Sequence, residues 1–286
     1  MKKNCPICES TQISKDGKYR RSNDSRIIQR LRCKCCGKRF SHATGTLEFR
    51  HKKRRISPLL FKLFASGVSQ RRAAQILGVH RVTVARKFKY LAQKSRKKNE
   101  TLQCRAQNIQ FDDLITKENS KLKPLSVSLA VDSDTRYILS AEVSKIRAFG
   151  HLSKKGRSKY PERGNEHKAG LERMFKKLLS CVDERASIRS DEHRFYPEFV
   201  ARYFPKSSYQ QFKSERACIV GQGELKRPRL DPLFCINHTC AMLRANINRL
   251  FRKTWCTTKD PRRLKDHLDI FICFYNFDYL KAPPYK

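Results

Sequence analysis

Apolar residues recur every three to four positions between residues 57 and 93, which is the period of a helix with one buried face. Ser57-Pro58 and Ser69 are typical of helix starts, and Gly78 interrupts the pattern as a tight turn would. Small or aliphatic residues stand where short helices would meet. The segment predicts a helix-turn-helix of three helices, at residues 59–66, 70–77 and 81–93.

From residue 108 the period shortens to two, as expected for strands with one buried face. Strands are predicted at 108–114, 125–131, 137–143, 186–191 and 209–216, and helices at 165–182, 197–203 and through most of the chain from residue 233. Residues 144–163 are expected to form a basic loop. Three strands, helix, strand, helix, strand and helix is the order of an RNase H-like domain with a mixed sheet.

The composition adds a strong positive charge. The 286 residues include 64 Lys and Arg against 26 Asp and Glu, a formal net charge of +38. Such a charge attracts polyanions, because each phosphate that is neutralised releases condensed counterions. The first residues lack the apolar segment of a secretory signal, and no apolar run is long enough to cross a membrane. We therefore expect a cytoplasmic protein that binds nucleic acid and no membrane.

Five of the twelve cysteines stand before residue 37, and four of them form two CxxC pairs. The pairs are Cys5 with Cys8 and Cys33 with Cys36. Two such turns complete a closed tetrahedron of thiolates, which is typical of structural zinc. Gly37 stands where the second turn needs a residue with left-handed backbone conformation. The pattern over residues 19–32 predicts a pair of strands. A zinc ribbon over residues 1–45 is expected; Cys35 is left over, although it could exchange with Cys36.

The helix-turn-helix, placed at residues 50–95, offers its third helix to a DNA major groove. The alternative is a three-helix packing unit with a basic surface. Residues 94–100 are expected to form a solvated linker to a third domain at 106–286, which makes the chain an α+β multidomain protein. The candidate DNA contacts are His80, Arg81, Thr83, Arg86 and Lys87.

Two acids mark the third domain. Asp112 lies on its first predicted strand and Asp191 ends its fourth, and in an RNase H-like sheet these strands are neighbours. Carboxylates that meet at strand ends bind Mg²⁺, and two such ions can activate a hydroxyl and stabilise the leaving oxygen of a phosphodiester. Asp132 and Asp134 are instead expected to cap a turn.

With these elements in place, the sequence resembles the DDE transposases of small bacterial insertion sequences that carry an N-terminal zinc ribbon and helix-turn-helix. The resemblance covers essentially the whole chain and implies metal-dependent DNA cleavage and strand transfer. It also implies Mg²⁺ or Mn²⁺ as cofactor, terminal inverted repeats and target DNA as partners, and a homodimer or larger synaptic complex at the bacterial nucleoid. Its carriers are the cysteine pairs, Ser69 to Ala74, Gln110 to Asp113, Ser190-Asp191, Leu243-Arg244, Asn248 to Trp255 and Tyr275 to Phe277.

Asp112 and Asp191 match the first two metal ligands of that family, and the third position departs from it. Relatives place Glu just before the Leu-Arg helix, where this chain has Asn237-His238. Both are candidate catalytic ligands, with Asp231 and Glu224 as nearby carboxylates. Asn237 could instead cap a helix.

A long basic helix is expected after this position. Arg244, Arg249, Arg252 and Lys253 would lie on it, with Arg244 and Arg252 two turns apart on a face that follows the DNA backbone. Trp255 is expected in the core.

Two other functions fit parts of the pattern. One is a DNA-binding regulator with an inactive transposase-like domain, against which the placement of Asp112 and Asp191 argues. The other is a repair or RNase H-type nuclease, which has no evident need for a separate DNA-reading module.

Overall fold

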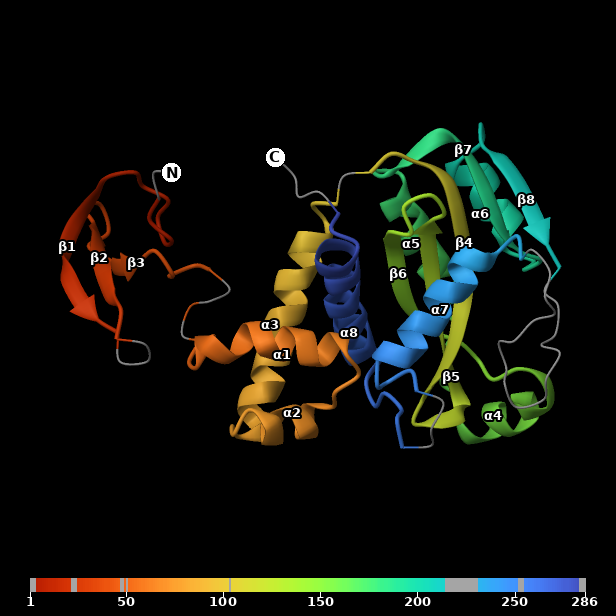
Figure 1. Ribbon diagram of the computed structural model, residues 1–286, viewed down its shortest axis with the longest axis horizontal. Coiled ribbons are helices and arrows are strands. Elements are labelled where there is room, and N and C mark those ends of the chain that lie inside the picture. The colour runs from red at the N-terminus through yellow and green to blue at the C-terminus, as the bar shows by residue number, and fades with distance from the viewer. Residues whose placement is uncertain are drawn as a thin grey trace.

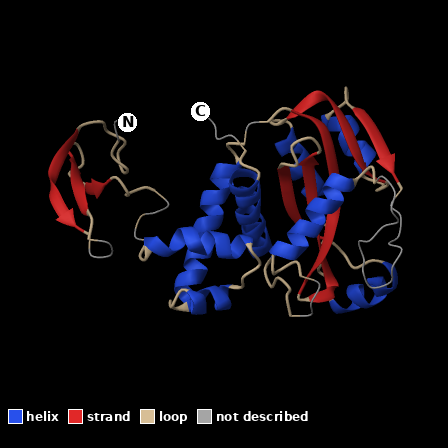
Figure 2. Cartoon of the chain, in the orientation of Figure 1, coloured by secondary structure: helices blue, strands red, loops and turns tan. Residues whose placement is uncertain are grey.

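Figure 1 shows a computed structural model of the chain. The structure describes residues 4–21, 25–46, 49, 51–102, 104–213, 231–251 and 255–282. These residues form an α+β protein with a three-stranded sheet, a mixed five-stranded sheet and eight α-helices. The two sheets lie at opposite ends of the molecule, and a group of helices lies between them (Figure 2). Within the described ranges, no helix has the length and hydrophobicity that a bilayer crossing requires.

The N-terminal sheet is an antiparallel meander of β1 (Ile13–Arg20), β2 (Ile27–Cys33) and β3 (Arg39–Ser41). The predicted strand pair is present, but its first strand begins at Ile13. The core of this module is small and contains two of the cysteines, Cys5 and Cys33, with Leu31 and Phe40.

Three helices follow: α1 (Ser57–Ala65), α2 (Gln70–Ile76) and α3 (Arg81–Asn99). Ser69 caps α2 by accepting a hydrogen bond from the Arg72 amide, and Gly78 turns the chain with φ +57°. The prediction of three helices is confirmed, but α3 continues through Asn99, so the linker expected at 94–100 is helix. The helix that packs against α3 accounts for this extension.

That helix is α8 (Pro261–Cys273), which lies along α3. Arg96 near the end of α3 forms ion pairs with Asp266 (3.2 Å) and Asp269 (2.7 Å) of α8. His267 of α8 donates from Nε2 to the carbonyl of Phe64 in α1 (2.8 Å). Helices α1–α3 are thus held against the C-terminal part of the chain.

The five-stranded sheet has the order β6-β5-β4-β7-β8. Strand β5 runs antiparallel to both β6 and β4, whereas β7 runs parallel to β4 and β8 parallel to β7. The predicted strands are present, and the first, second and fourth are longer than expected. Their bounds are β4 (Ala106–Glu118), β5 (Ser120–Asp132), β6 (Ile138–Lys145), β7 (Val182–Asp191) and β8 (Ser208–Phe212). The fourth strand begins at Val182, so the helix expected over 165–182 is shorter and ends at Leu178. Residues 214–216 of the last predicted strand lie outside the described residues.

Helices cover both faces of this sheet. On one face, α5 (His167–Leu178) and α6 (Tyr196–Tyr203) pack against Phe111 and Ile188. On the other, α7 (Phe234–Asn246) and α8 pack against the apolar side chains of β5. The basic segment at 144–163, expected to be a loop, contains α4 (Ser153–Lys159).

Candidate metal centres and nucleic-acid interface

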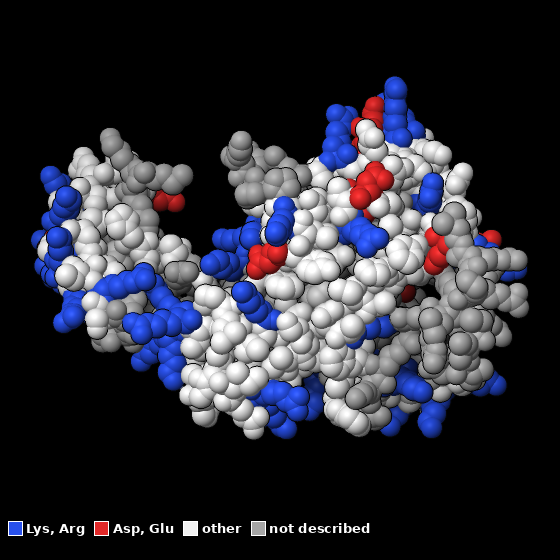
Figure 3. Space-filling view, in the orientation of Figure 1, with Lys and Arg blue, Asp and Glu red and all other residues white. Residues whose placement is uncertain are grey.

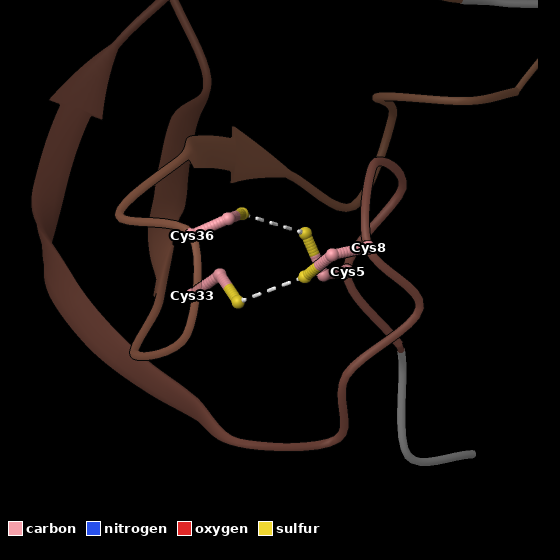
Figure 4. Close-up of side chains that lie close together, drawn as sticks. All are labelled: Cys5, Cys8, Cys33 and Cys36. Carbon is pink, nitrogen blue, oxygen red and sulfur yellow. Dashed lines mark hydrogen bonds between the residues drawn. The ribbon is translucent and has the colours of Figure 1, made fainter.

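The four cysteines of the two CxxC pairs converge on one point (Figure 4). All four sulfur atoms lie within 4.8 Å of one another. The Sγ atoms of Cys5 and Cys36 are 3.6 Å apart, and those of Cys8 and Cys33 are 3.5 Å apart. A tetrahedron with metal–sulfur bonds of about 2.3 Å has sulfur–sulfur distances of about 3.8 Å. The four thiols therefore fit a metal ion such as zinc.

Backbone turns orient these thiols. The amide of Glu9 donates to the Cys5 carbonyl and that of Gly37 to the Cys33 carbonyl, both at 3.0 Å. Gly37 is left-handed, with φ +69°, as predicted. The Cys36 amide lowers the pKa of the Cys33 thiol to about 6, which favours the thiolate that a metal requires. Cys35 is exposed and contacts Ser10, outside the cluster.

The two acids of the second candidate centre lie on neighbouring parallel strands. Phe111 of β4 is in register with Ser190 of β7, so the next residues, Asp112 and Asp191, project from the same face of the sheet. Both are half-buried. Oδ1 of Asp191 is buried and accepts no hydrogen bond from any described residue. An orphaned carboxylate oxygen beside a second carboxyl group suits a hard cation such as Mg²⁺.

Burial and the nearby carboxylates make ionisation of these acids costly. Burial and the charge of Asp191 raise the pKa of Asp112 to about 7. Burial and the charges of Asp113 and Glu192 raise the pKa of Asp191 to about 6. Arg244 of α7 partly offsets the rise at Asp112, so the acids have a basic neighbour that was not expected.

Helix α7 supplies the candidates for a third ligand. Asn237 and Arg244 are seven residues apart and share a face of α7, and Arg244 interacts with Asp112. Nδ2 of Asn237 donates to Oδ2 of Asp231 (2.7 Å). Asn237 is not a helix cap, because α7 begins at Phe234 and Leu233 precedes it.

The ring of His238 contacts Phe234, with ring centroids 5.8 Å apart, and its Nδ1 is buried without a hydrogen bond from any described residue. Glu224 lies outside the described residues. In the part of the chain that is described, the cysteine cluster is the sole group of three or more His, Cys, Asp or Glu placed to share an ion. The acid pair therefore has no third such residue there, and Asn237 shares a helix face with Arg244, which interacts with Asp112.

Asp113 takes part in a network that the sequence did not indicate. It projects from the opposite face of β4, and its Oδ1 accepts hydrogen bonds from Ser126 (2.5 Å) and Ser128 (2.6 Å) of β5. Its Oδ2 contacts Nε2 of His167 in α5 (2.5 Å) and accepts from the Tyr196 hydroxyl in α6 (2.8 Å). Burial would raise the pKa of Asp113, but these partners lower it below its ordinary value. The network anchors the strand that carries Asp112.

The predicted DNA contacts on α3 fall into two groups. His80, Arg81 and Arg86 are exposed and Thr83 is half-buried. The His80 ring also caps α3 by accepting from the Val82 amide (3.2 Å). Lys87 is 2% exposed, and its ammonium donates to the Ser57 hydroxyl (3.0 Å), so its assignment to a groove is corrected. Exposed Lys89, one turn from Arg86, was missed.

The long basic helix after the third-ligand position is also corrected. Helix α7 ends at Asn246, and Ile247 is extended, so Arg244 and Arg249 do not share a helix. Arg249 lies over the Phe88 ring, 5.7 Å from its centroid, and burial lowers its pKa. Arg252 and Lys253 lie outside the described residues. Trp255, expected in the core, is 80% exposed.

Lys and Arg form patches on the visible surface, over the N-terminal sheet and along the lower edge of the helices (Figure 3). The arrangement thus combines four thiols that fit a soft cation, two carboxyl groups that suit a hard one, and a surface that attracts polyanions. Comparison of the chain with models of protein families and with curated proteins finds no match, so its function is inferred from these residues alone.

Proposed function

We propose that this protein is a transposase, which binds the ends of a DNA element and catalyses metal-dependent strand cleavage and strand transfer. One observation carries the proposal: Asp112 and Asp191 stand side by side on parallel strands, facing one helix, in a chain of net charge +38. Acids so placed resist ionisation unless a cation balances them. A phosphodiester brought to them by the basic surface would complete the site.

The sheet supports this assignment. An order of β6-β5-β4-β7-β8, with an antiparallel first half and a parallel second half, is typical of an RNase H-like domain. In this proposal residues 1–45 are a zinc ribbon, 50–95 a helix-turn-helix and 106–286 the catalytic domain. The zinc is structural, because four thiolates leave no open position for a substrate.

Each part of the proposed site has a role. Asp112 and Asp191 offer carboxylate oxygens to Mg²⁺ or Mn²⁺, and Asn237 offers an amide carbonyl from α7. When bound, the ions would activate the attacking hydroxyl and stabilise the leaving oxygen. Gln110 fixes α7 over the sheet, because its side chain donates to the Pro232 carbonyl and accepts from the Ile236 amide, both at 3.0 Å.

DNA recognition is assigned to α3 and the N-terminal module. Arg81, Arg86 and Lys89 are exposed on the third helix of the helix-turn-helix, where a major groove would be read. The contacts between α3 and α8 hold this reader at a set position relative to the acids. An end bound by α3 would therefore reach the acids at a set distance.

The test is cleavage of labelled duplex that carries the gene's own flanking DNA, with Mg²⁺ or Mn²⁺. Wild type should nick at a defined end, whereas Asp191→Asn should bind the duplex equally well and cut at least about 10³-fold more slowly. Glu184→Gln removes an exposed acid from the same strand and is the matched control, which should cut as wild type does. Equal cutting by Asp191→Asn would refute the site.

A second candidate is a DNA-binding regulator whose rear domain does not cut. It is favoured by one observation: among the described residues, no third carboxylate or histidine is placed to share an ion with the acid pair. Tight binding to the flanking DNA without cleavage by wild type would establish this alternative. Inverted repeats around the gene would argue for transposition.

A further inference from the structure

A basic pocket lies where the helix-turn-helix meets the C-terminal part of the chain. It has a volume of about 560 Å³, and its walls come from α1, α2, α3, α8 and residues at 248–249 and 255–259. Nothing in the proposed strand-transfer chemistry uses it. Residues that define its character are Arg71, Arg81, Arg249, Trp255, Lys259 and His267.

The pocket is suited to an anion. Arg71 and Arg81 line it from the helix-turn-helix, and Arg249 and Lys259 line it from the other wall. None of the described residues that line it is Asp or Glu. Arg81 also starts α3, so the pocket adjoins the helix assigned to groove reading. DNA bound there would have phosphates within reach of this wall.

Trp255 gives the pocket a second chemical feature. Its side chain is 80% exposed, so aromatic surface is accessible to solvent beside several cations. Aromatic side chains next to basic ones bind unpaired nucleotides, because a base stacks on the ring while its phosphates meet the cations. In a duplex each base face already stacks on a neighbour, so a paired base is not free to do this.

We propose that this pocket holds an unpaired DNA nucleotide, with its base stacked on Trp255 and its phosphates against Arg71, Arg81 and Lys259. The inference rests on the proposed function for the identity of the polymer as DNA. It adds that the DNA next to the α3 contact is locally unpaired. In this proposal Trp255 binds an unpaired base, whereas Asp112 and Asp191 take part in strand cleavage.

Fluorescence tests this directly, because Trp255 is the one tryptophan in the sequence. Full-length zinc-loaded protein, with no Mg²⁺ or Mn²⁺ added, would be titrated with single-stranded oligothymidine of about 12 nucleotides, and separately with a linear blunt-ended duplex that has no hairpin loop. Binding would be followed by fluorescence anisotropy of a dye on the DNA. The single strand should quench the indole and protect it from acrylamide, and the linear duplex should do neither.

Variants separate stacking from charge. Trp255→Ala should weaken binding of the single strand about 5- to 100-fold and leave binding of the linear duplex within about twofold. Lys259→Ala should weaken binding of the single strand, whereas Lys97→Ala, an exposed lysine outside the pocket, should not. Unchanged circular dichroism would show that Trp255→Ala folds, as expected for so exposed a side chain.

Two results would overturn the inference. One is binding of the single strand, seen by anisotropy, with no change in indole emission or acrylamide access. The other is equal weakening of both probes by Trp255→Ala, which would make Trp255 a contact to the DNA backbone. Neither depends on cleavage, so loss of the transposase assignment in the Asp191→Asn experiment would leave this test intact.

Discussion

The cysteine cluster and the acid pair are both candidate metal centres, and they are built in opposite ways. Four thiols meet within 4.8 Å from two short turns of one small module. Asp112 and Asp191 meet because two strands far apart in sequence lie side by side, and no third acid joins them among the described residues. In the first site local spacing supplies every ligand. In the second, the topology of the sheet supplies the ligands.

The difference extends to stability. The N-terminal module has a small core, of which two cysteines are part, so a bound ion would hold the fold together. The acids instead stand over two large apolar clusters that hold the sheet without them. An ion should therefore stabilise the first site greatly. In the second site the fold holds the acids together against their mutual repulsion.

The largest expected effect follows from the proposed zinc site, because Cys33→Ser should then unfold the N-terminal module. Structural zinc sites bind with about 10–16 kcal/mol of free energy, and three thiolates hold the ion far less well than four. The variant should lose bound zinc and the amide protection of β1–β3, as measured by metal analysis and hydrogen exchange. Cys35→Ser, which removes the neighbouring exposed thiol, should keep both. Full zinc content in Cys33→Ser would break the comparison.

A second prediction sets Asp112 against its neighbour Asp113. Asp113→Asn should cost about 2–4 kcal/mol in urea unfolding, because an amide nitrogen would face the groups that now donate to the carboxylate. Asp112→Asn should be neutral or stabilising by about 1–3 kcal/mol at pH 8, since it removes a poorly tolerated charge. If both variants lost the same free energy of unfolding, the role of Asp112 would be to stabilise the fold, as for Asp113.

The cysteine site could be predicted almost completely from sequence. Cys5, Cys8, Cys33 and Cys36 carry their geometry in their spacing, and Gly37 marks the turn. The helices α1–α3 and the strands of the large sheet followed from apolar periodicity in the same way. Each of these features can be recognised from patterns within short stretches of the chain.

Features that depend on distant partners were missed. Helix α3 continues past residue 93 because Arg96 meets Asp266 and Asp269, which no local pattern reveals. Lys87 had the position of a groove contact, but its ammonium turns inwards to Ser57. The His167–Asp113 contact joins residues on separate elements. One clue to this contact was available in the sequence. Asp112 and Asp113 are adjacent on a strand, so their side chains must project from opposite faces of the sheet.

The third prediction concerns the protonation of His267, which belongs neither to the cysteine cluster nor to the acid pair. Burial lowers the pKa of His267 from 6.5 to about 4. The unfolded chain therefore binds the proton more readily, so this contribution to stability is complete above about pH 6.5 and is lost as the pH falls towards 4. The loss should reach about 2–3 kcal/mol.

His267→Gln isolates this effect, because glutamine can still donate to the Phe64 carbonyl but does not titrate. The difference in unfolding free energy between wild type and variant should shift in favour of the variant between pH 7 and pH 4.5. A parallel pH dependence in wild type and His267→Gln would contradict the assignment.

The smallest expected effect comes from giving the acid pair what the cysteine cluster already has, a further anionic ligand. Asn237→Asp should lower stability without metal by about 1 kcal/mol, because it removes the hydrogen bond to Asp231 and places two carboxylates together. Mn²⁺ should then raise the melting temperature more than it does in wild type, since a carboxylate binds a hard cation better than an amide. His238→Gln should not change the response to Mn²⁺, because this ring faces Phe234. If His238→Gln weakens the response and Asn237→Asp does not alter it, then His238 and not Asn237 is the third ligand.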